Sequence, residues 1–303
     1  GLAQSAAADQ HHTLQYDSRD RLTRFASTNG SGTTGNTVST TTYRFDANGN
    51  RTATTHTTEA GSGASTTTIP STTQADSNRL ATLHQQVVPT DAAGNITAVD
   101  GVSLLHDPAG RISAVTSNRQ ATHYLHNAWG QRIYKGSTRA DHLPMQAGTA
   151  YVYDEAGYLL GEYAAGSSTE YVWLPSDAGV FAVAVVHNGQ VYAIEADHLG
   201  TPRRISNAGN QTVWLWGYSG FGEIGPQVTP DAPNGFVFNL RYPGQYFDSE
   251  SGLFYNWHRS YDPRTGRYTQ PDPIGLAGGW NRFTYVDNVR WEQRIRWDCR
   301  QQR

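Results

Sequence analysis

The sequence predicts an all-β protein built on a long antiparallel sheet of consecutive hairpins. Only 16% of the 303 residues are charged, whereas aromatic residues and the turn formers Gly, Thr, Ser and Asn are abundant, and this composition favours strands. A turn motif also recurs along the chain, with an aromatic residue, Asp, two further residues and Gly. Before residue 289, no segment has the apolar period of an amphipathic helix.

The recurring motif has the chemistry of a hairpin turn. An Asp or Asn in the first turn position accepts a hydrogen bond from the backbone two residues on, and the Gly takes the left-handed conformation of a type I turn with a G1 bulge. Residues 45–51 show the motif as Phe-Asp-Ala-Asn-Gly-Asn-Arg, residues 16–22 carry Asp20 in place of Gly, and residues 206–210 contain Gly209. Further units begin at the following residues: Asp91, His106, His126, Tyr153, Phe247 and Tyr261. A catalytic role would require reactive partners beside each Asp, so the repetition indicates a structural role.

Two Thr-rich inserts and the overall composition of the chain refine the predicted fold and exclude several classes of function. Residues 26–42 and 52–77 are rich in Thr, Ser and Gly, which predicts long exposed loops or weak edge strands. The net charge of −3 argues against general nucleic-acid binding. The single cysteine, Cys299, rules out a disulfide framework and a Cys-rich zinc site. No run of eighteen apolar residues occurs, so no membrane span is expected.

Two blocks give the repeats a specific resemblance. Residues 195–222 contain D-H-L-G-T-P-R, and residues 240–288 contain R-Y-P-G-Q-Y, Y-D-P-R-T-G-R, D-P-I-G-L and G-G-W-N. The first resembles the signature of the Rhs family, whose YD repeats also occur in Tc-toxin C components and teneurins. The second resembles the Rhs repeat-associated core. The weaker repeats extend the resemblance over residues 15–288.

The resemblance implies a cocoon-like shell with an internal plug. It divides the chain into a flexible N-terminal end (residues 1–14), a shell segment (15–235), a core that forms the plug (236–288) and an atypical basic tail (289–303). In this family a toxin usually follows the core, and PAAR- or VgrG-type modules of the type VI secretion apparatus deliver the shell. The expected partners are therefore N-terminal shell and delivery modules and a toxin cargo. The expected location is the bacterial cytoplasm before export, then outside or at the surface of the cell.

The resemblance also raises the question of catalysis. The family's self-cleavage is attributed to core aspartates that act after a Leu in a second, downstream D-P-x-G-L. Asp272 matches the first such motif, and Asp287 and Asp262 are partner candidates by sequence proximity. The residues themselves leave open a plain turn role for Asp272, because Asp-Pro-x-Gly is an ordinary turn. The scissile motif is not found after Asn288 in this sequence, so we expect a chain that stops before its toxin and does not cleave itself.

Three functions remain as alternatives. The leading one is a structural shell protein for toxin encapsulation, without cofactor or metal; the pair Asp197–His198 lacks further ligands at metal-site spacing. The second is an aspartyl autoprotease that acts in cis. The third is a carbohydrate-binding surface on which exposed aromatic residues stack, with Trp214 and Trp216 as the residues to test.

Overall fold

The chain divides into two compact units. The computed structural model describes residues 10–29, 36–60, 63–137, 148–176 and 179–285. Unit 1 takes its described residues from Gly1–Asp100, Gly217–Ile224 and Tyr261–Arg303, and unit 2 takes them from Gly101–Trp216 and Gly225–Ser260. Each unit therefore combines segments that are far apart in the sequence.

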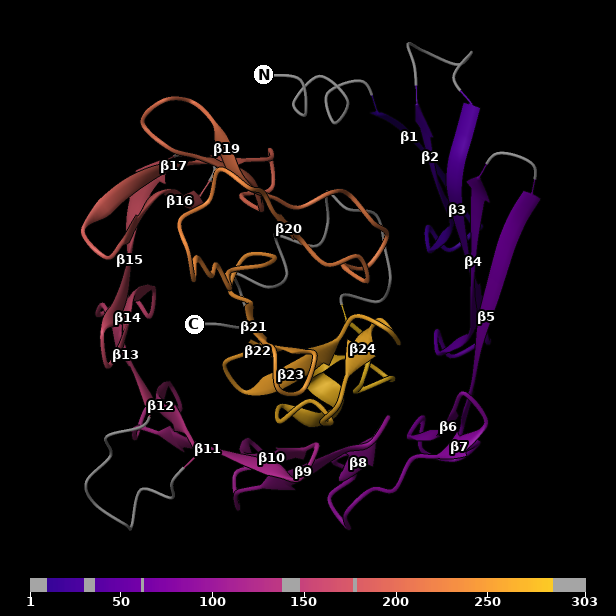
Figure 1. The fold of residues 1–303 in the computed structure, drawn as a ribbon. Helices are drawn as coiled ribbons and strands as arrows, with labels where there is room; N and C mark the ends of the chain where they lie inside the picture. The colour runs from indigo at the N-terminus through magenta and orange to yellow at the C-terminus, as the bar shows by residue number, and fades with distance from the viewer. Residues whose placement is uncertain (1–9, 30–35, 61–62, 138–147, 177–178, 286–303) are drawn as a thin grey trace. The chain divides into compact units, whose positions relative to one another are not determined.

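Unit 1 is built on a seven-stranded antiparallel sheet whose strands are neighbours in chain order (Figure 1). These strands are β1 (Gln10–Tyr16), β2 (Leu22–Asn29), β3 (Asn36–Phe45), β4 (Arg51–Ala60), β5 (Gly63–Thr73), β6 (Leu80–Leu83) and β7 (Gln86–Val87). The unit also contains β8 (Ala98–Val99), the end of β23 (Arg259–Asp262), β24 (Arg267–Tyr268) and the short 3₁₀-helix η2 (Gly275–Gly278).

The prediction of long exposed loops or weak edge strands in the Thr-rich inserts is wrong, because most of the described residues of these inserts form the strands β2 to β5, which lie inside the sheet. β-Branched Thr side chains suit a pleated sheet, and their hydroxyls bond across it. Thr55 lies opposite Thr68 and Thr57 opposite Thr66, with hydroxyl oxygens 3.0 and 3.1 Å apart. Low apolar content therefore did not prevent strand formation here, since threonine pairs replace apolar contacts on the exposed face.

Unit 2 contains a long antiparallel sheet in which every strand from β9 to β20 lies beside its neighbour in sequence (Figure 1). Its strands are β9 (Val102–His106), β10 (Ile112–Ser117), β11 (Gln120–His126), β12 (Arg132–Gly136), β13 (Gly148–Tyr153), β14 (Leu159–Ala164), β15 (Ser167–Ser176), β16 (Gly179–His187), β17 (Gln190–Ala196), β18 (Pro202–Ser206), β19 (Thr212–Leu215) and β20 (Gln227–Val228). A hairpin of β21 (Tyr246–Asp248) and β22 (Leu253–Asn256) completes the unit. The predicted all-β fold of antiparallel hairpins is confirmed.

Seven of the predicted hairpin turns share one geometry, whereas the turns at Asp248 and Asp262 carry one extra residue before the Gly. In the turn that opens at Asp46, the Asp46 carboxylate accepts hydrogen bonds from the N–H groups of Asn48 and Asn50 at 2.9 and 2.8 Å. Gly49 has φ 80°, the left-handed conformation that a residue without Cβ adopts most easily. Asp20 (φ 60°) and Asn210 (φ 58°) take the same position in their turns. The expectation that Gly209 fills it was wrong by one residue.

A cluster of apolar side chains forms the core of unit 1. Leu22, Phe25 and Tyr43 come from the sheet, and Phe221 comes from the segment 217–224, which enters the unit from elsewhere in the sequence. The rings of Tyr43 and Phe221 meet edge to face at 4.8 Å. A Cβ on Gly220 would lie 2.3 Å from the Tyr43 hydroxyl, so this glycine permits the close approach of segment 217–224 to the sheet.

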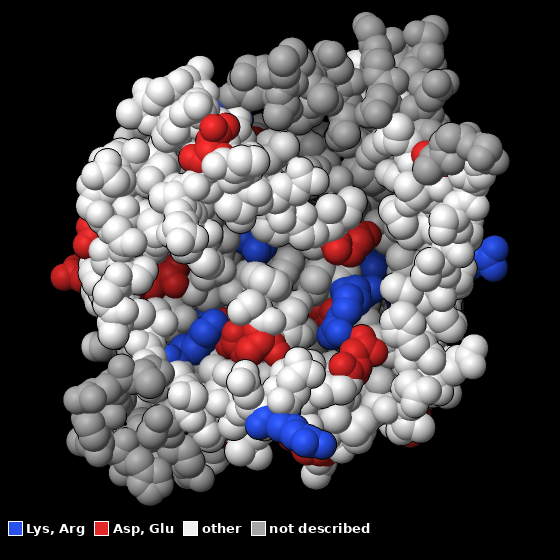
Figure 2. All heavy atoms as spheres, in the orientation of Figure 1, with Lys and Arg blue, Asp and Glu red and all other residues white. Residues whose placement is uncertain are grey.

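The surface carries few charges. On the face drawn in Figure 2, acidic and basic side chains form small separate groups, and most of the described surface is uncharged. The described residues include no α-helix. Accordingly, in this part of the chain there is no helix of the length and hydropathy that crossing a membrane requires.

Candidate functional site

Asp272, the first predicted catalytic residue, lies in a tight turn of unit 1. Its Oδ1 accepts a hydrogen bond from the Ile274 N–H at 3.0 Å, and its own N–H donates to the Arg282 carbonyl at 2.8 Å. The residue is 6% exposed. A Cβ on Gly278 would lie 2.7 Å from Asp272 Oδ2, so the carboxylate lies directly against this glycine. These contacts are those of a turn-capping Asp, and the catalytic role of Asp272 stays a prediction.

The two suggested partners of Asp272 are Asp262 and Asp287. Arg264 binds both oxygens of the Asp262 carboxylate, with Nε 2.8 Å from Oδ1 and Nη2 2.9 Å from Oδ2. There is no hydrogen bond between the two described residues Asp262 and Asp272. Asp287 lies outside the described residues. In the structure, Asp262 is therefore a turn residue that forms an ion pair with Arg264.

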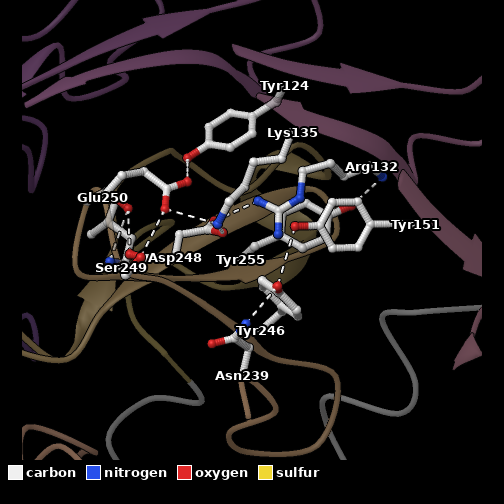
Figure 3. Close-up of polar contacts among 12 residues, drawn as sticks. Tyr124, Arg132, Lys135, Tyr151, Asn239, Tyr246, Asp248, Ser249, Glu250 and Tyr255 are labelled. Atoms are coloured by element: carbon white, nitrogen blue, oxygen red, sulfur yellow. Dashed lines mark hydrogen bonds and ion pairs between the residues drawn. The ribbon is translucent and has the colours of Figure 1, made fainter. Parts of the chain in front are cut away.

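A buried charge network in unit 2 joins the β21–β22 hairpin to the sheet (Figure 3). Arg132 and Lys135 belong to β12, and Asp248 is the last residue of β21. Arg132 Nη1 donates to Asp248 Oδ2 at 2.6 Å, and Lys135 Nζ lies 3.4 Å from Asp248 Oδ1. The side chains of Arg132 and Asp248 are only 2% and 6% exposed. A buried pair of this kind depends on both partners, because the loss of one leaves an uncompensated charge in the interior.

Tyrosine rings surround the Arg132 guanidinium. Its carbon lies 5.0 Å from the ring centres of Tyr124, Tyr151 and Tyr246, and 4.4 Å from that of Tyr255. The negative faces of aromatic rings attract a cation, most strongly where water is excluded. Burial works to lower the pKa of Arg132, but the Asp248 carboxylate outweighs it and raises that pKa well above its ordinary value. Arg132 is therefore a permanent positive charge at the centre of the network.

Glu250 and Lys135 extend the network on one side. Lys135 Nζ lies 3.0 Å from Glu250 Oε2, and the Tyr124 hydroxyl donates to Glu250 Oε1. Burial works to raise the pKa of Glu250, but the Lys135 charge and the Tyr124 hydrogen bond hold it below the ordinary value. Glu250, two residues beyond β21, is thus bound to both β11 and β12.

Glu162 of β14 extends the network on the other side. Its carboxylate accepts hydrogen bonds from the hydroxyl of Tyr171 and, at 2.5 Å, from that of Tyr246. The Tyr246 hydroxyl also accepts from Asn239 Nδ2 at 2.8 Å. Burial raises the pKa of Glu162, and the hydrogen bonds only partly offset this effect. Tyr246 is therefore joined both to the sheet and to the segment that precedes it.

The buried charge network has the geometry of a structural anchor, not of a catalytic site. Two carboxylates with separated pKa values, Glu162 and Glu250, are the pattern expected for acid–base chemistry. Here, however, each carboxylate of the network accepts hydrogen bonds from side chains of the protein itself and lies in the packed interior of unit 2. The network therefore holds residues 239–250 against strands β11 to β15.

Sequence reasoning missed this network. Asp248 was assigned only to a turn, and Arg132, Lys135, Glu162 and Glu250 were not singled out. Asp248 lies 116 residues from Arg132 in sequence, and no local pattern connects the two. The one available signal was the surplus of Tyr residues in the predicted strands, which indicated buried hydroxyls that need partners.

The two predicted sugar-stacking residues are buried, so that assignment is wrong. Trp214 and Trp216 are each 1% exposed. Two guanidinium groups contact the Trp216 ring, that of Arg203 at 5.1 Å and that of Arg241 at 5.3 Å. Arg203 also pairs with Asp197 at 2.9 Å. The D-H-L-G-T-P-R and R-Y-P-G-Q-Y motifs thus meet at Trp216, which explains the burial of this indole.

The described residues contain no cluster of three or more His, Cys, Asp or Glu side chains that could hold a metal ion. His198 is exposed, and its neighbour Asp197 accepts hydrogen bonds from the N–H groups of Leu199 and Thr201. Asp197 and His198 therefore open a hairpin turn.

Comparison with known proteins agrees with this architecture. The model of the family Teneurin YD-shell matches residues 3–284. The chain is 40% identical to the protein YibJ of Escherichia coli over 99 residues, which are 33% of this chain and 41% of YibJ. It is 37% identical to the toxin protein Tse5 of Pseudomonas aeruginosa over 107 residues, which are 35% of this chain and 8% of Tse5. The chain thus spans less than half the length of these relatives.

Solved structures share the fold. The Photorhabdus luminescens Tc holotoxin pore contains a chain that superposes with a TM-score of 0.69 at 20% identity, and the match covers 92% of this chain and 15% of that one. At this identity the likeness shows the fold alone. The resemblance to YD-repeat proteins is confirmed by the family model, which covers nearly the whole sequence: the chain belongs to the Teneurin YD-shell family.

Proposed function

We propose that this chain forms part of the wall of a protein shell that encloses a polypeptide cargo, with residues 236–288 as the segment held inside. Membership of the YD-shell family supports a structural role. The unbroken order of hairpins from β9 to β20 supports it as well, because a sheet that grows by one hairpin at a time can form an extended wall.

The observation that carries the proposal is the network around Asp248. It fastens the β21–β22 hairpin to the sheet by buried ion pairs instead of a flexible, solvated contact. A segment that must stay in place beside an unfolded guest needs such an anchor. The scarcity of surface charge also supports the proposal, since a weakly charged wall forms few specific ion pairs with the polypeptide that it encloses.

Protease protection tests the shell role. We would fuse an unstructured, protease-sensitive polypeptide after the last residue and follow its digestion under conditions in which the chain itself stays intact. We expect slower digestion than for the same polypeptide on an unrelated folded carrier, and faster digestion again in the Asp248→Asn variant. Equal rates on the two carriers would contradict enclosure by this chain.

The cargo and its delivery form the finer part of the proposal. The relative Tse5 is named a toxin protein, which supports a toxin as the enclosed polypeptide. Delivery through PAAR- or VgrG-type modules of a type VI secretion apparatus, and release outside the producing cell, stay predictions from the family resemblance. Co-purification of this chain's full gene product with a VgrG-type protein would test the delivery prediction.

A second candidate is self-cleavage by Asp272. The observation that favours it is the place of this carboxylate, which is 6% exposed and lies inside the D-P-I-G-L motif. In a chain extended after Asn288 by an ending that contains D-P-T-G-L, we expect a cleaved product that Asp272→Asn abolishes. An extended chain that stays whole would contradict the autoprotease role.

A further inference from the structure

Trp257 adopts a strained backbone conformation between β22 and β23. Its φ is 54°, in the left-handed region that bulky residues seldom occupy. Such strain persists where the surroundings fix the residue, and it often marks a position with a special role. The contacts of the Trp257 side chain are therefore the place to look for the reason.

The Trp257 indole lies across two hairpin turns of unit 2. Its Nε1–H donates to the backbone carbonyl of Trp129 at 3.0 Å, in the turn formed by residues 127–131. A Cβ on Gly157, in the turn 154–158, would lie 2.5 Å from the far edge of the indole. A Cβ on Gly130 would lie 3.3 Å from Nε1. The two glycines therefore leave the space that the indole fills.

Tyr255, two residues earlier, binds the backbone of the same turn. Its hydroxyl accepts a hydrogen bond from the Arg132 N–H at 3.0 Å and donates to the Gly130 carbonyl at 3.3 Å. Tyr255 and Trp257 thus contact three backbone groups within four residues, those of Trp129, Gly130 and Arg132. The contacts recognise the shape and the hydrogen-bonding groups of the turn.

We propose that Tyr255 and Trp257 are a register key, which selects the turns 127–131 and 154–158 among the many similar turns of the chain and so positions residues 246–256. Seven of the predicted hairpin turns share one backbone geometry, so hydrogen bonds to the backbone of a turn do not by themselves distinguish turn 127–131 from the others. The indole in the space above Gly157 adds a contact specific to these two turns, and with the buried Arg132–Asp248 pair it opposes a shift of the hairpin by one repeat. This positioning role stands apart from cargo enclosure, since it concerns only contacts within unit 2.

Matched glycine variants test the key by hydrogen exchange of residues 246–256. Gly157→Ala and Gly189→Ala impose a similar left-handed strain, at φ 90° and 77°, but the Gly189 Cβ position has nothing within 4 Å. We expect Gly157→Ala, and not Gly189→Ala, to speed exchange in 246–256 by about tenfold, the equivalent of one good aromatic contact. In a Trp257→Ala background, Gly157→Ala should add no acceleration in 246–256 beyond that of Gly189→Ala. Equal effects of the two glycine variants with Trp257 present would overturn the proposal.

Trp257→Gly separates a key from an ordinary loop residue. Glycine accepts a φ of 54° without strain, so a residue with a local loop role would leave exchange in 246–256 unchanged or slower after this substitution. The register key predicts faster exchange in 246–256 and in the turn 127–131, with the distant turn 46–50 unchanged. Unchanged or slower exchange in Trp257→Gly would overturn the proposal even if the chain encloses cargo.

Discussion

Buried arginines in this chain are balanced in two ways. Arg132 has a buried carboxylate, Asp248, whereas Arg241 has aromatic rings and backbone carbonyls. Arg241 Nη1 donates to the carbonyls of Phe238 and Leu240 at 3.0 and 2.9 Å. Burial lowers the pKa of Arg241 to about 10, while the carboxylate partner raises the pKa of Arg132. The Arg132 site therefore depends on a single counter-charge, and loss of that charge is the sharpest test of the network.

We expect Asp248→Asn to lower the free energy of unfolding by about 3 to 5 kcal/mol, because it leaves the buried Arg132 without its counter-charge. Urea unfolding at neutral pH measures the change. Asp17→Asn is a matched control, since the Asp17–Arg21 pair is partly exposed and should contribute less than about 1 kcal/mol. Adding Arg132→Met to Asp248→Asn should recover part of the loss. Equal losses of unfolding free energy in the Asp17 and Asp248 variants would show that the buried pair contributes no more stability than the partly exposed one.

His126 beside the network makes stability depend on pH. Burial, together with the charges of Arg111 and Arg132, lowers its pKa from 6.5 to about 4. The unfolded chain therefore binds the proton first, and the stability present above pH 6.5 is lost as the pH falls toward 4, by up to about 3 kcal/mol. We expect His126→Gln to flatten the pH dependence of the unfolding free energy in this window. An unchanged slope in the variant would refute the assignment.

At the scale of elements, segment 217–224 contributes to a core that its neighbours in sequence do not share. Phe221 is fully buried, and its ring lies 4.0 Å from the Arg51 guanidinium of β4. Its carbonyl accepts a hydrogen bond from the Tyr261 hydroxyl at 2.8 Å. Phe221 thus connects the sheet of unit 1 with the end of β23.

Truncation of Phe221 should destabilise unit 1 strongly. We expect Phe221→Ala to cost about 3 to 5 kcal/mol, the usual range for a large aromatic residue removed from a core. Ile224→Ala in the same segment is the control, because Ile224 is 42% exposed and should lose far less. Hydrogen exchange of β2 to β4 reports the effect. Similar exchange in the two variants would mean that the segment is not part of the core.

At the scale of the whole molecule, local features could be predicted from the sequence and distant pairings could not. The turn at Asp46 needs only residues 46–50, so its motif was enough. The pairing of Arg132 with Asp248 depends on the path of the chain over a separation of 116 residues. The burial of Trp216 likewise follows from the approach of Arg203 and Arg241, which belong to separate motifs. The Thr-rich strands were missed because threonine side chains pair across the sheet, as Thr55 does with Thr68, so these strands form without a regular alternation of apolar residues.

The interleaved chain predicts that the two units unfold together. Segment 217–224 supplies Phe221 to unit 1, yet the strands on either side of it, β19 and β20, belong to unit 2. When unit 2 unfolds, both ends of the segment become free, and keeping it docked costs additional conformational entropy. We therefore expect the slowest amides of β2 to β4 and those of β15 to β17 to exchange with the same opening free energy in low urea. We also expect Asp248→Asn to speed hydrogen exchange in both sets of strands. Exchange in β2 to β4 that stays at the wild-type rate in Asp248→Asn would show that unit 1 folds independently.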